Sequence, residues 1–304
     1  MKIATTTRDF YNYNLSEEEI IFCYKNTNFK YIDYCFYTVH ANPNSPYMQD
    51  SDKAWKTEIE SILKASKECG IKFVQAHAPT YNPAQKKYNY NLCIRAMQRT
   101  IEACHLLGIP TTVMHTSFSP IHQYPNDWKE YFKYNKKFVG DLLSVAEKYG
   151  INVCIENTST GNMGNCYFPR KSCEMNDFIS YVNHPLLGAC WDTGHAVMEQ
   201  MYDQYDAIKE LGSNLKAVHI HDNGTFLDQH LAPFCGKLQL DSVIKGLIDI
   251  NYKGTFTYES TSFLSNINGN GPLKQLPLEL KIDCVSLLYK IGKFALSSYG
   301  IFEE

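Results

Sequence analysis

Short runs of apolar and β-branched residues alternate along the chain with longer segments whose apolar positions recur every three or four residues. The short runs are typical of strands buried in a parallel sheet, and the longer segments are typical of amphipathic helices. Counted along the chain, the alternation predicts strands at 2–6, 31–36, 72–76, 111–115, 152–156, 187–192, 217–221 and 255–259. The helices are predicted at 16–26, 53–69, 86–107, 127–149, 174–182, 203–212, 239–250 and 274–296.

Glycines mark the ends of three predicted helices. Gly70, Gly108 and Gly150 each follow a helical stretch and directly precede the next strand, where a left-handed residue commonly ends a helix. Parallel strands that alternate with helices predict an α/β fold, and eight such units predict a closed (β/α)8 TIM barrel. The sequence contains no linker-like break, so we expect one domain over residues 1–304. The helical region near 197–212 has a pattern compatible with two pieces.

Composition excludes several classes of protein. The 304 residues are 44% hydrophobic and 20% charged, which is typical of a globular domain with a substantial core. Lysine and arginine number 29 against 32 acidic residues, and no block of like charges occurs, which argues against a nucleic-acid surface. No apolar run is long enough for a membrane span or a secretory signal. The eleven cysteines form no CxxC pair, so we expect reduced thiols in a cytoplasmic protein.

Polar residues concentrate where the predicted strands end. Functional side chains of a TIM barrel lie at the carboxyl ends of the strands and in the loops that follow. Six of the ten histidines are at such positions, namely His77, His115, His195, His219, His221 and His230. A single histidine there is more often structural than functional, but six converging on one mouth indicate a site.

Metal coordination explains this concentration best. Glu156, Asp192, His219 and Glu259 come from four successive strands and offer three carboxylates and one imidazole. Such an oxygen-rich set favours Mn²⁺ or Mg²⁺, and we expect Mn²⁺, while Co²⁺ and Zn²⁺ are also compatible. The competing interpretation is that the carboxylates form ion pairs across the barrel top, but few basic residues occur at the same strand ends.

Three motifs add a family resemblance over about residues 71–260. They are Asp192-Thr-Gly-His195, His219-Ile-His-Asp222, and Asp228-Gln-His230-Leu followed by Gly236. In this order the motifs resemble the xylose isomerase-like barrel superfamily, which contains sugar and sugar-phosphate isomerases and epimerases and also DNA-repair enzymes of the endonuclease IV type. The resemblance implies that Glu156, Asp192, His219 and Glu259 hold the ion and that His195 contacts a substrate oxygen.

Spacing alone does not decide between His219 and His221 as the ligand, because both face the same side of a strand. The family pattern favours His219 and leaves His221 for the substrate. We also expect His77 and His115 to contact the substrate. Lys237, next to Gly236, is a candidate contact for a substrate phosphate, although an ordinary solvated lysine is equally compatible with this loop.

The first functional interpretation is a sugar or sugar-phosphate isomerase or 3-epimerase, with a small sugar as its partner. The ion would stabilise an enediolate, and Glu156 and Glu259 would remove and return a proton. The same chemistry would also serve a dehydratase or lyase acting on keto sugars or cyclitols. Barrels of this superfamily often pair, so a homo-oligomer is compatible with the sequence.

The second interpretation is a phosphodiesterase of the endonuclease IV type with three zinc ions. The resemblance assigns His77, His115 and Glu156 to one ion, the four residues above to the next, and His195, Asp228 and His230 to the third. Two departures argue against this class, since His221 stands where it usually has Asn and Gln229 stands where it usually has Arg. The sequence therefore favours the sugar enzyme.

Overall fold

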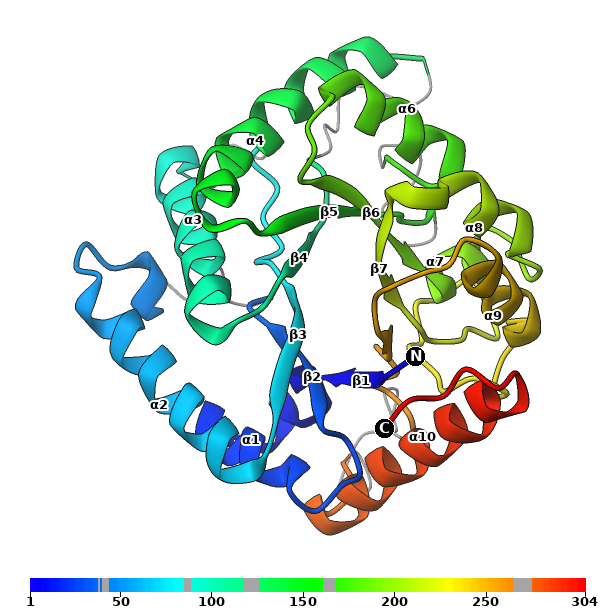
Figure 1. The fold of residues 1–304 in the computed structure, drawn as a ribbon. Coiled ribbons are helices and arrows are strands. Elements are labelled where there is room, and N and C mark those ends of the chain that lie inside the picture. Colours follow the sequence, from blue (N-terminus) through cyan, green and yellow to red (C-terminus); the bar gives the residue numbers. More distant parts are fainter. Residues whose placement is uncertain (38, 40–43, 85–88, 118–125, 161–167, 265–274) are drawn as a thin grey trace.

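The computed structural model describes residues 1–304 except 38, 40–43, 85–88, 118–125, 161–167 and 265–274. Within this part of the chain, parallel strands form an inner ring and helices surround it (Figure 1). The strands are β1 (Ile3–Thr6), β2 (Tyr31–Cys35), β3 (Lys72–His77), β4 (Thr111–Met114), β5 (Asn152–Glu156), β6 (Leu187–Asp192), β7 (Leu215–His219) and β8 (Phe256–Thr257). All eight predicted strands are therefore present.

The strands are hydrogen-bonded in the order β7-β6-β5-β4-β3-β2-β1-β8. A parallel bridge between Ile220 and Tyr258 joins the two outer strands of this order. There the Ile220 amide donates to Thr257 O at 2.8 Å, and the Glu259 amide donates to Ile220 O at 3.1 Å. These bonds close the ring, and the predicted (β/α)8 barrel is confirmed.

The outer layer consists of helices whose ends follow from the local sequence. They are α1 (Glu17–Tyr24), α2 (Lys53–Cys69), α3 (Tyr90–Leu107), α4 (Trp128–Tyr149), α6 (Ser172–Val182), α7 (Thr193–Met198), α8 (Tyr205–Leu211), α9 (Leu240–Asp249) and α10 (Leu278–Ser298). Ser16 begins α1 with a capping box, in which its hydroxyl accepts from the Glu19 amide. Gly70, Gly108 and Gly150 end α2, α3 and α4 with φ between +68° and +73°, as their positions predicted.

Two elements near the candidate site differ from the prediction, whereas the split of a third region agrees with it. A 3-10 helix, η1 (Thr7–Tyr13), follows β1 directly, and the hydrophobic pattern did not predict it. β7 ends at His219, two residues before the predicted end, so His221 lies beyond the strand. The region near 197–212 is split into α7 and α8, because the buried Gln204 between them donates its side-chain amide to Thr193 O and Met201 O.

The barrel interior is layered, because alternate strand residues point inward. Val113, Cys154, Cys190 and Ala217 form a small buried cluster of their own. Three of them stand two residues before Glu156, Asp192 and His219 on the same strands. Compact, mostly apolar side chains therefore form the floor beneath the strand ends. The larger core lies between the strands and the helices.

Two findings concern the environment of the chain. All ten described cysteines are free thiols. In the described residues, no helix combines the length and the apolar character that crossing a bilayer would need.

Candidate metal centre

Four acidic and imidazole side chains meet at the carboxyl end of the barrel. Glu156, Asp192 and His219 are the last residues of β5, β6 and β7, and Glu259 follows β8 by two residues. Potential ligand atoms of these four side chains all lie within 4.8 Å of one another, and each side chain is buried. The barrel thus brings together the four residues predicted as ligands from positions up to 103 apart in the sequence.

His219 lies between the two glutamates. Its Nδ1 is 2.8 Å from Glu156 Oε1 and 3.6 Å from Glu259 Oε2. Its other ring nitrogen, Nε2, points the opposite way, toward Asp33 Oδ2 at 3.5 Å. One edge of the imidazole therefore faces the carboxylate cluster, while the other faces into the barrel.

His221 occupies a different position from His219. Its Nε2 is 2.9 Å from Asp192 Oδ2, and its ring stacks on His230 with centroids 4.3 Å apart. A Cβ at Gly194 would lie 2.0 Å from the Cε1 atom of His221, so this approach requires glycine. The geometry thus separates the two histidines: His219 faces both glutamates, whereas His221 contacts Asp192.

Two further histidines approach Glu156 from the opposite side. His77 Nε2 and His115 Nε2 lie 3.4 Å and 3.5 Å from Glu156 Oε2. The carbonyl of Ala78 is 2.7 Å from His77 Nδ1, and since a carbonyl only accepts, Nδ1 carries the proton. This hydrogen bond orients the ring so that Nε2 faces the site.

In a third group, made of His195, His230 and Asp228, two imidazoles again face one carboxylate oxygen. His195 Nε2 and His230 Nε2 lie 3.4 Å and 3.1 Å from Asp228 Oδ2. Their Nδ1 atoms donate to the carbonyls of Asn157, at 2.9 Å, and Glu259, at 2.8 Å. Backbone carbonyls thus orient both rings so that Nε2 converges on one carboxylate, an arrangement common among metal-binding histidines.

Electrostatics keep the glutamates ionised despite their burial. Burial alone would raise the pKa of Glu156, but the imidazoles of His219 and His115 outweigh it and hold that pKa well below its usual range. For Glu259 the opposing effects are burial, which raises the pKa, and His219, His230 and Arg8, which together lower it to about 2. The cluster therefore offers carboxylates rather than carboxylic acids.

The donor set fits a divalent ion. Three carboxylates and one imidazole supply oxygen and nitrogen ligands without thiolate. Among the described residues, Glu156 Oε2 is buried and receives no hydrogen bond. A buried carboxylate oxygen in this state is expensive unless a cation neutralises it. Hence the four residues are suited to holding a metal.

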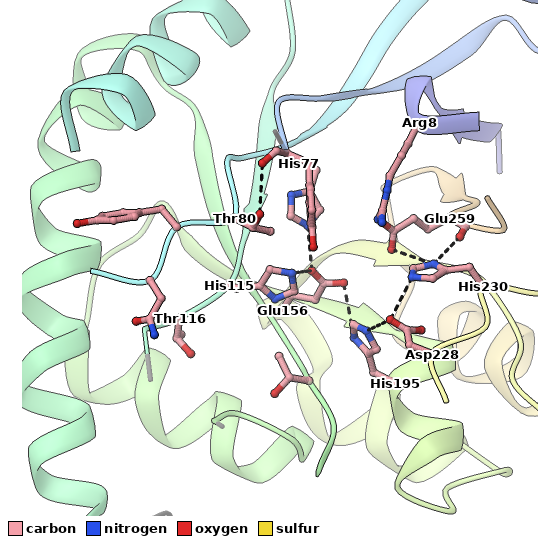
Figure 2. Close-up of a pocket in the computed structure, with 14 residues that line it drawn as sticks. Arg8, His77, Thr80, His115, Thr116, Glu156, His195, Asp228, His230 and Glu259 are labelled. Carbon is pink, nitrogen blue, oxygen red and sulfur yellow. Dashed lines mark hydrogen bonds and ion pairs between the residues drawn. The ribbon is translucent and has the colours of Figure 1, made fainter. Parts of the chain in front are cut away.

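Glu156 and Glu259 of the cluster line a cavity of about 310 Å³, whereas Asp192 and His219 do not (Figure 2). This volume is near the lower end of the range for ligand sites, as suits a small molecule. The lining residues are Arg8, Tyr37, His77, Thr80, Tyr81, Asn82, His115, Thr116, Glu156, Thr158, His195, Asp228, His230 and Glu259. Neither His221, which is fully buried, nor Lys237 belongs to this lining. Lys237 is exposed, with its ammonium 5.6 Å from the ring centroid of Tyr202.

The loop after β7 is held by Asp222. Its carboxylate accepts hydrogen bonds from the amides of Asn223, Gly236 and Leu238 at 2.8–2.9 Å. A Cβ at position 236 would come within 2.4 Å of that carboxylate, so the loop can adopt this conformation only with glycine there. Asp222 therefore organises the loop that carries Asp228 and His230.

Sequence reasoning missed two residues that shape the site. Arg8 Nη1 is 3.0 Å from Glu259 Oε1, and its guanidinium lies over the Tyr37 ring at 4.5 Å. Asp33 on β2 faces His219, with Asp33 Oδ2 3.5 Å from His219 Nε2. The available signal for Arg8 was its place two residues past the first predicted strand, and for Asp33 it was a charged residue in an otherwise apolar strand.

Comparisons with known proteins agree with this architecture. The model of the xylose isomerase-like TIM barrel family matches residues 24–276. An uncharacterized protein of Methanocaldococcus jannaschii is 26% identical over 208 residues, covering 66% of this chain and 69% of that protein.

Two solved structures illustrate the shared fold. D-psicose 3-epimerase from Clostridium cellulolyticum, solved with D-tagatose, is similar with a TM-score of 0.72 at 17% identity, over 97% of this chain and 99% of that one. The IOLI protein with a bound zinc atom is similar with a TM-score of 0.72 at 18% identity, over the full length of both chains.

Proposed function

Because the chain belongs to the xylose isomerase-like TIM barrel family, we propose that it is a metal-dependent isomerase or epimerase of a keto sugar, either free or phosphorylated. The observation that carries this proposal is the buried cluster of Glu156, Asp192, His219 and Glu259, of which the two glutamates line a small cavity. One structure of similar fold is a D-psicose 3-epimerase solved with D-tagatose, which supports a keto sugar as the substrate class here.

These four residues would hold the ion. Their oxygen-rich donor set favours Mn²⁺, and Mg²⁺, Co²⁺ or Zn²⁺ would also fit. A bound divalent ion would polarise the carbonyl of the sugar and stabilise the enediolate that forms when a neighbouring proton leaves.

Glu156 and Glu259 are the proposed acid and base. Both are buried and ionised, and they approach His219 from strands on different sides, β5 and β8. One carboxylate takes the proton from the carbon beside the carbonyl. The other first takes up a proton from solvent and gives it to the opposite face of that carbon, and the first then releases its proton to solvent. This exchange inverts the carbon in an epimerase. In an isomerase the proton returns to the neighbouring carbon.

The remaining polar residues of the cavity would bind the sugar hydroxyls. We propose His77, His115 and His195 for this role, because all three line the cavity and their Nε2 atoms lie beside Glu156 or Asp228. His221 would act mainly through Asp192. Lys237 remains a predicted contact for the phosphate of a substrate that extends beyond the cavity.

The experiment that tests this proposal is conversion of keto sugars by the purified protein after loading with Mn²⁺. A panel of free and phosphorylated pentuloses and hexuloses is incubated with the protein, and the products are resolved by chromatography. Formation of an isomer or epimer, absent in the metal-free protein, is the expected result. Failure of every ketose would contradict the proposal.

A second candidate function is a metal-dependent phosphodiesterase with three zinc ions. The observation that favours it is the pair of extra groups, one of His77 and His115 with Glu156 and the other of His195 and His230 with Asp228. Counting metal ions in the protein as purified distinguishes the two candidates. One ion per chain supports the sugar enzyme. Three zinc ions per chain would direct the search to abasic DNA and other phosphodiesters.

We also propose a cytoplasmic location, since the described cysteines are free and most of them are buried. A homo-oligomer stays a prediction that size-exclusion chromatography with light scattering would test.

A further inference from the structure

A buried carboxylate lies beneath the metal centre without an ordinary partner. Asp33, on β2, is 1% exposed. Across the described residues, neither of its oxygens accepts a hydrogen bond. His219 lies within ion-pair distance of Asp33, with His219 Nε2 3.5 Å from Asp33 Oδ2. Burying a carboxylate without hydrogen bonds costs free energy, so we expect Asp33 to have a function that explains its position.

The nitrogen of His219 that faces Asp33 is in a similar state. Nε2 also lacks a hydrogen-bond partner within the described part of the chain, although the side chain is completely buried. Two unsatisfied buried atoms, one an obligate acceptor and the other a ring nitrogen that can donate, therefore face each other. A small shortening of their separation would satisfy both.

The position of Asp33 in the barrel explains why it can reach this nitrogen. In the strand register Asp33 pairs with Gln75, which stands two residues before His77, just as Cys154 stands two residues before Glu156. Asp33 thus belongs to the interior layer below the metal centre. From there it meets the inner edge of the imidazole, while Nδ1 on the outer edge faces Glu156 and Glu259.

We propose that Asp33 is the positioning residue of the metal centre: it accepts the Nε2 proton of His219 and so directs the Nδ1 lone pair toward the ion. This inference rests on the proposed function, because it assumes that the cluster binds a metal. A carboxylate is well suited to this task because an ionised carboxylate can only accept, which fixes the ring tautomer and makes the metal-binding nitrogen more basic.

An alternative role for Asp33 is a simple ion pair with a doubly protonated His219. In that case Nδ1 would donate to Glu156, and His219 would not bind an ion. The two roles differ in the state of Nδ1 in the metal-loaded protein. In the first role Nδ1 binds the ion and only Nε2 carries a proton, whereas in the second role both nitrogens carry a proton.

The test uses Asp33→Asn, with Asp9→Asn as the matched control. Asp9 is also buried, and its carboxylate accepts from the Thr5 hydroxyl at 2.7 Å rather than contacting the cluster. Mn²⁺ and Co²⁺ dissociation constants are measured by titration, the visible absorption spectrum of bound Co²⁺ is recorded, and circular dichroism of the metal-free proteins checks the fold. We expect Asp33→Asn to weaken metal binding by about 10- to 100-fold and to change the Co²⁺ spectrum. Asp9→Asn should change neither.

A second measurement on the unsubstituted protein keeps the inference testable if Asp33→Asn does not fold. With ¹⁵N-labelled histidine and bound Zn²⁺, nuclear magnetic resonance identifies which nitrogen of His219 carries the proton. We expect a protonated Nε2. A protonated Nδ1, or a metal affinity and Co²⁺ spectrum unchanged in Asp33→Asn, would overturn the inference while leaving the proposed function intact. If the unsubstituted protein bound no ion, both the proposed function and this inference would fail.

Discussion

Arg8 and Glu259 form an ion pair at the wall of the cavity, with Arg8 Nη1 3.0 Å from Glu259 Oε1. The other oxygen of Glu259 faces His219 Nδ1 at 3.6 Å. Arg8 therefore orients the carboxylate so that one oxygen remains for the metal centre. The pair joins the first strand unit to the last, because Arg8 follows β1 and Glu259 follows β8, which pairs with β1 (Figure 2).

Replacement of Arg8 tests this orientation. Because a charge-assisted hydrogen bond of this kind contributes about 1.5–3 kcal/mol, we expect Arg8→Gln to lower kcat by about 10- to 100-fold. Arg8→Lys, which keeps the charge, should recover part of the loss. Steady-state kinetics on the ketose identified as substrate provide the measurement. An unchanged kcat in Arg8→Gln would show that Glu259 needs no such support.

The two proposed acid–base residues should be indispensable. Glu156→Gln and Glu259→Gln remove the carboxylate with little change in shape, so we expect turnover to fall by at least about 10²-fold. Circular dichroism should show an intact fold in both variants. Glu147→Gln, at an exposed glutamate paired with His184, is the matched control and should be fully active. Normal turnover in either active-site variant would remove that residue from the mechanism.

Metal removal should destabilise the protein without unfolding it. A ligand that binds only the native state, present at about 100 times its dissociation constant, adds about 2.7 kcal/mol, which for a chain of this size raises Tm by about 4 °C. Scanning calorimetry with and without a chelator measures the shift, and added Mn²⁺ should reverse it. In Asp192→Asn the chelator should have much less effect. An identical Tm in both states would indicate that the cluster is a set of ion pairs and not a metal site.

Gly194 should be intolerant of substitution. A Cβ at this position would overlap His221 Cε1 at 2.0 Å, so Gly194→Ala must displace the ring that contacts Asp192. We expect a loss of about 1–3 kcal/mol in unfolding free energy, together with weaker metal binding.

The matched control is Gly140→Ala in the exposed middle of α4, where an added Cβ meets no atom within 4 Å. That change should stabilise the protein by about 0.5–1 kcal/mol. Urea unfolding measures both variants. Equal stability of the two would mean that His221 has room to move.

Ionisation of Glu17, outside the active site, should make the free energy of unfolding depend on pH. Burial raises its pKa to about 7, although the Tyr34 hydroxyl donates to Glu17 Oε2 at 2.9 Å and partly opposes the shift. The folded protein thus binds this proton more tightly than the unfolded chain, whose glutamates titrate near pH 4.3. Stability from this group is complete below about pH 4.3 and is lost as the pH rises through about 7.

Glu17→Gln tests the sign of this effect. The variant cannot ionise, so its stability relative to the unsubstituted protein should increase by about 1–3 kcal/mol between pH 4.5 and pH 8. Urea unfolding at both pH values measures the difference. A difference that stays constant with pH would show that Glu17 titrates normally.

The sequence predicted the barrel because its signals are local. Each strand is a short apolar run, and glycines such as Gly70 and Gly108 end the helices before the next strand. The sequence also predicted that Glu156, Asp192, His219 and Glu259 would lie together, because strand ends of a parallel barrel must meet on one face. No distance information was needed for either inference.

Other parts of the site depend on how the barrel closes. Arg8 was missed because η1 has no apolar periodicity, and its partner Glu259 is 251 residues away. The role of Asp33 depends on strand register and on the direction of the His219 ring, which no sequence pattern contains. The different positions of His219 and His221 follow from the early end of β7, a boundary that the hydrophobic pattern placed two residues too late.

The most direct test of the central claim is incorporation of solvent deuterium into a ketose. The Mn²⁺-loaded protein is incubated with the ketose panel in deuterated water, and each sugar is examined by mass spectrometry and nuclear magnetic resonance. We expect one hydrogen on a carbon next to the carbonyl to be replaced by deuterium, in a reaction that depends on the metal and is lost in Glu156→Gln and Glu259→Gln. Absence of exchange in every ketose, together with three zinc ions per chain and hydrolysis of a phosphodiester, would contradict the claim.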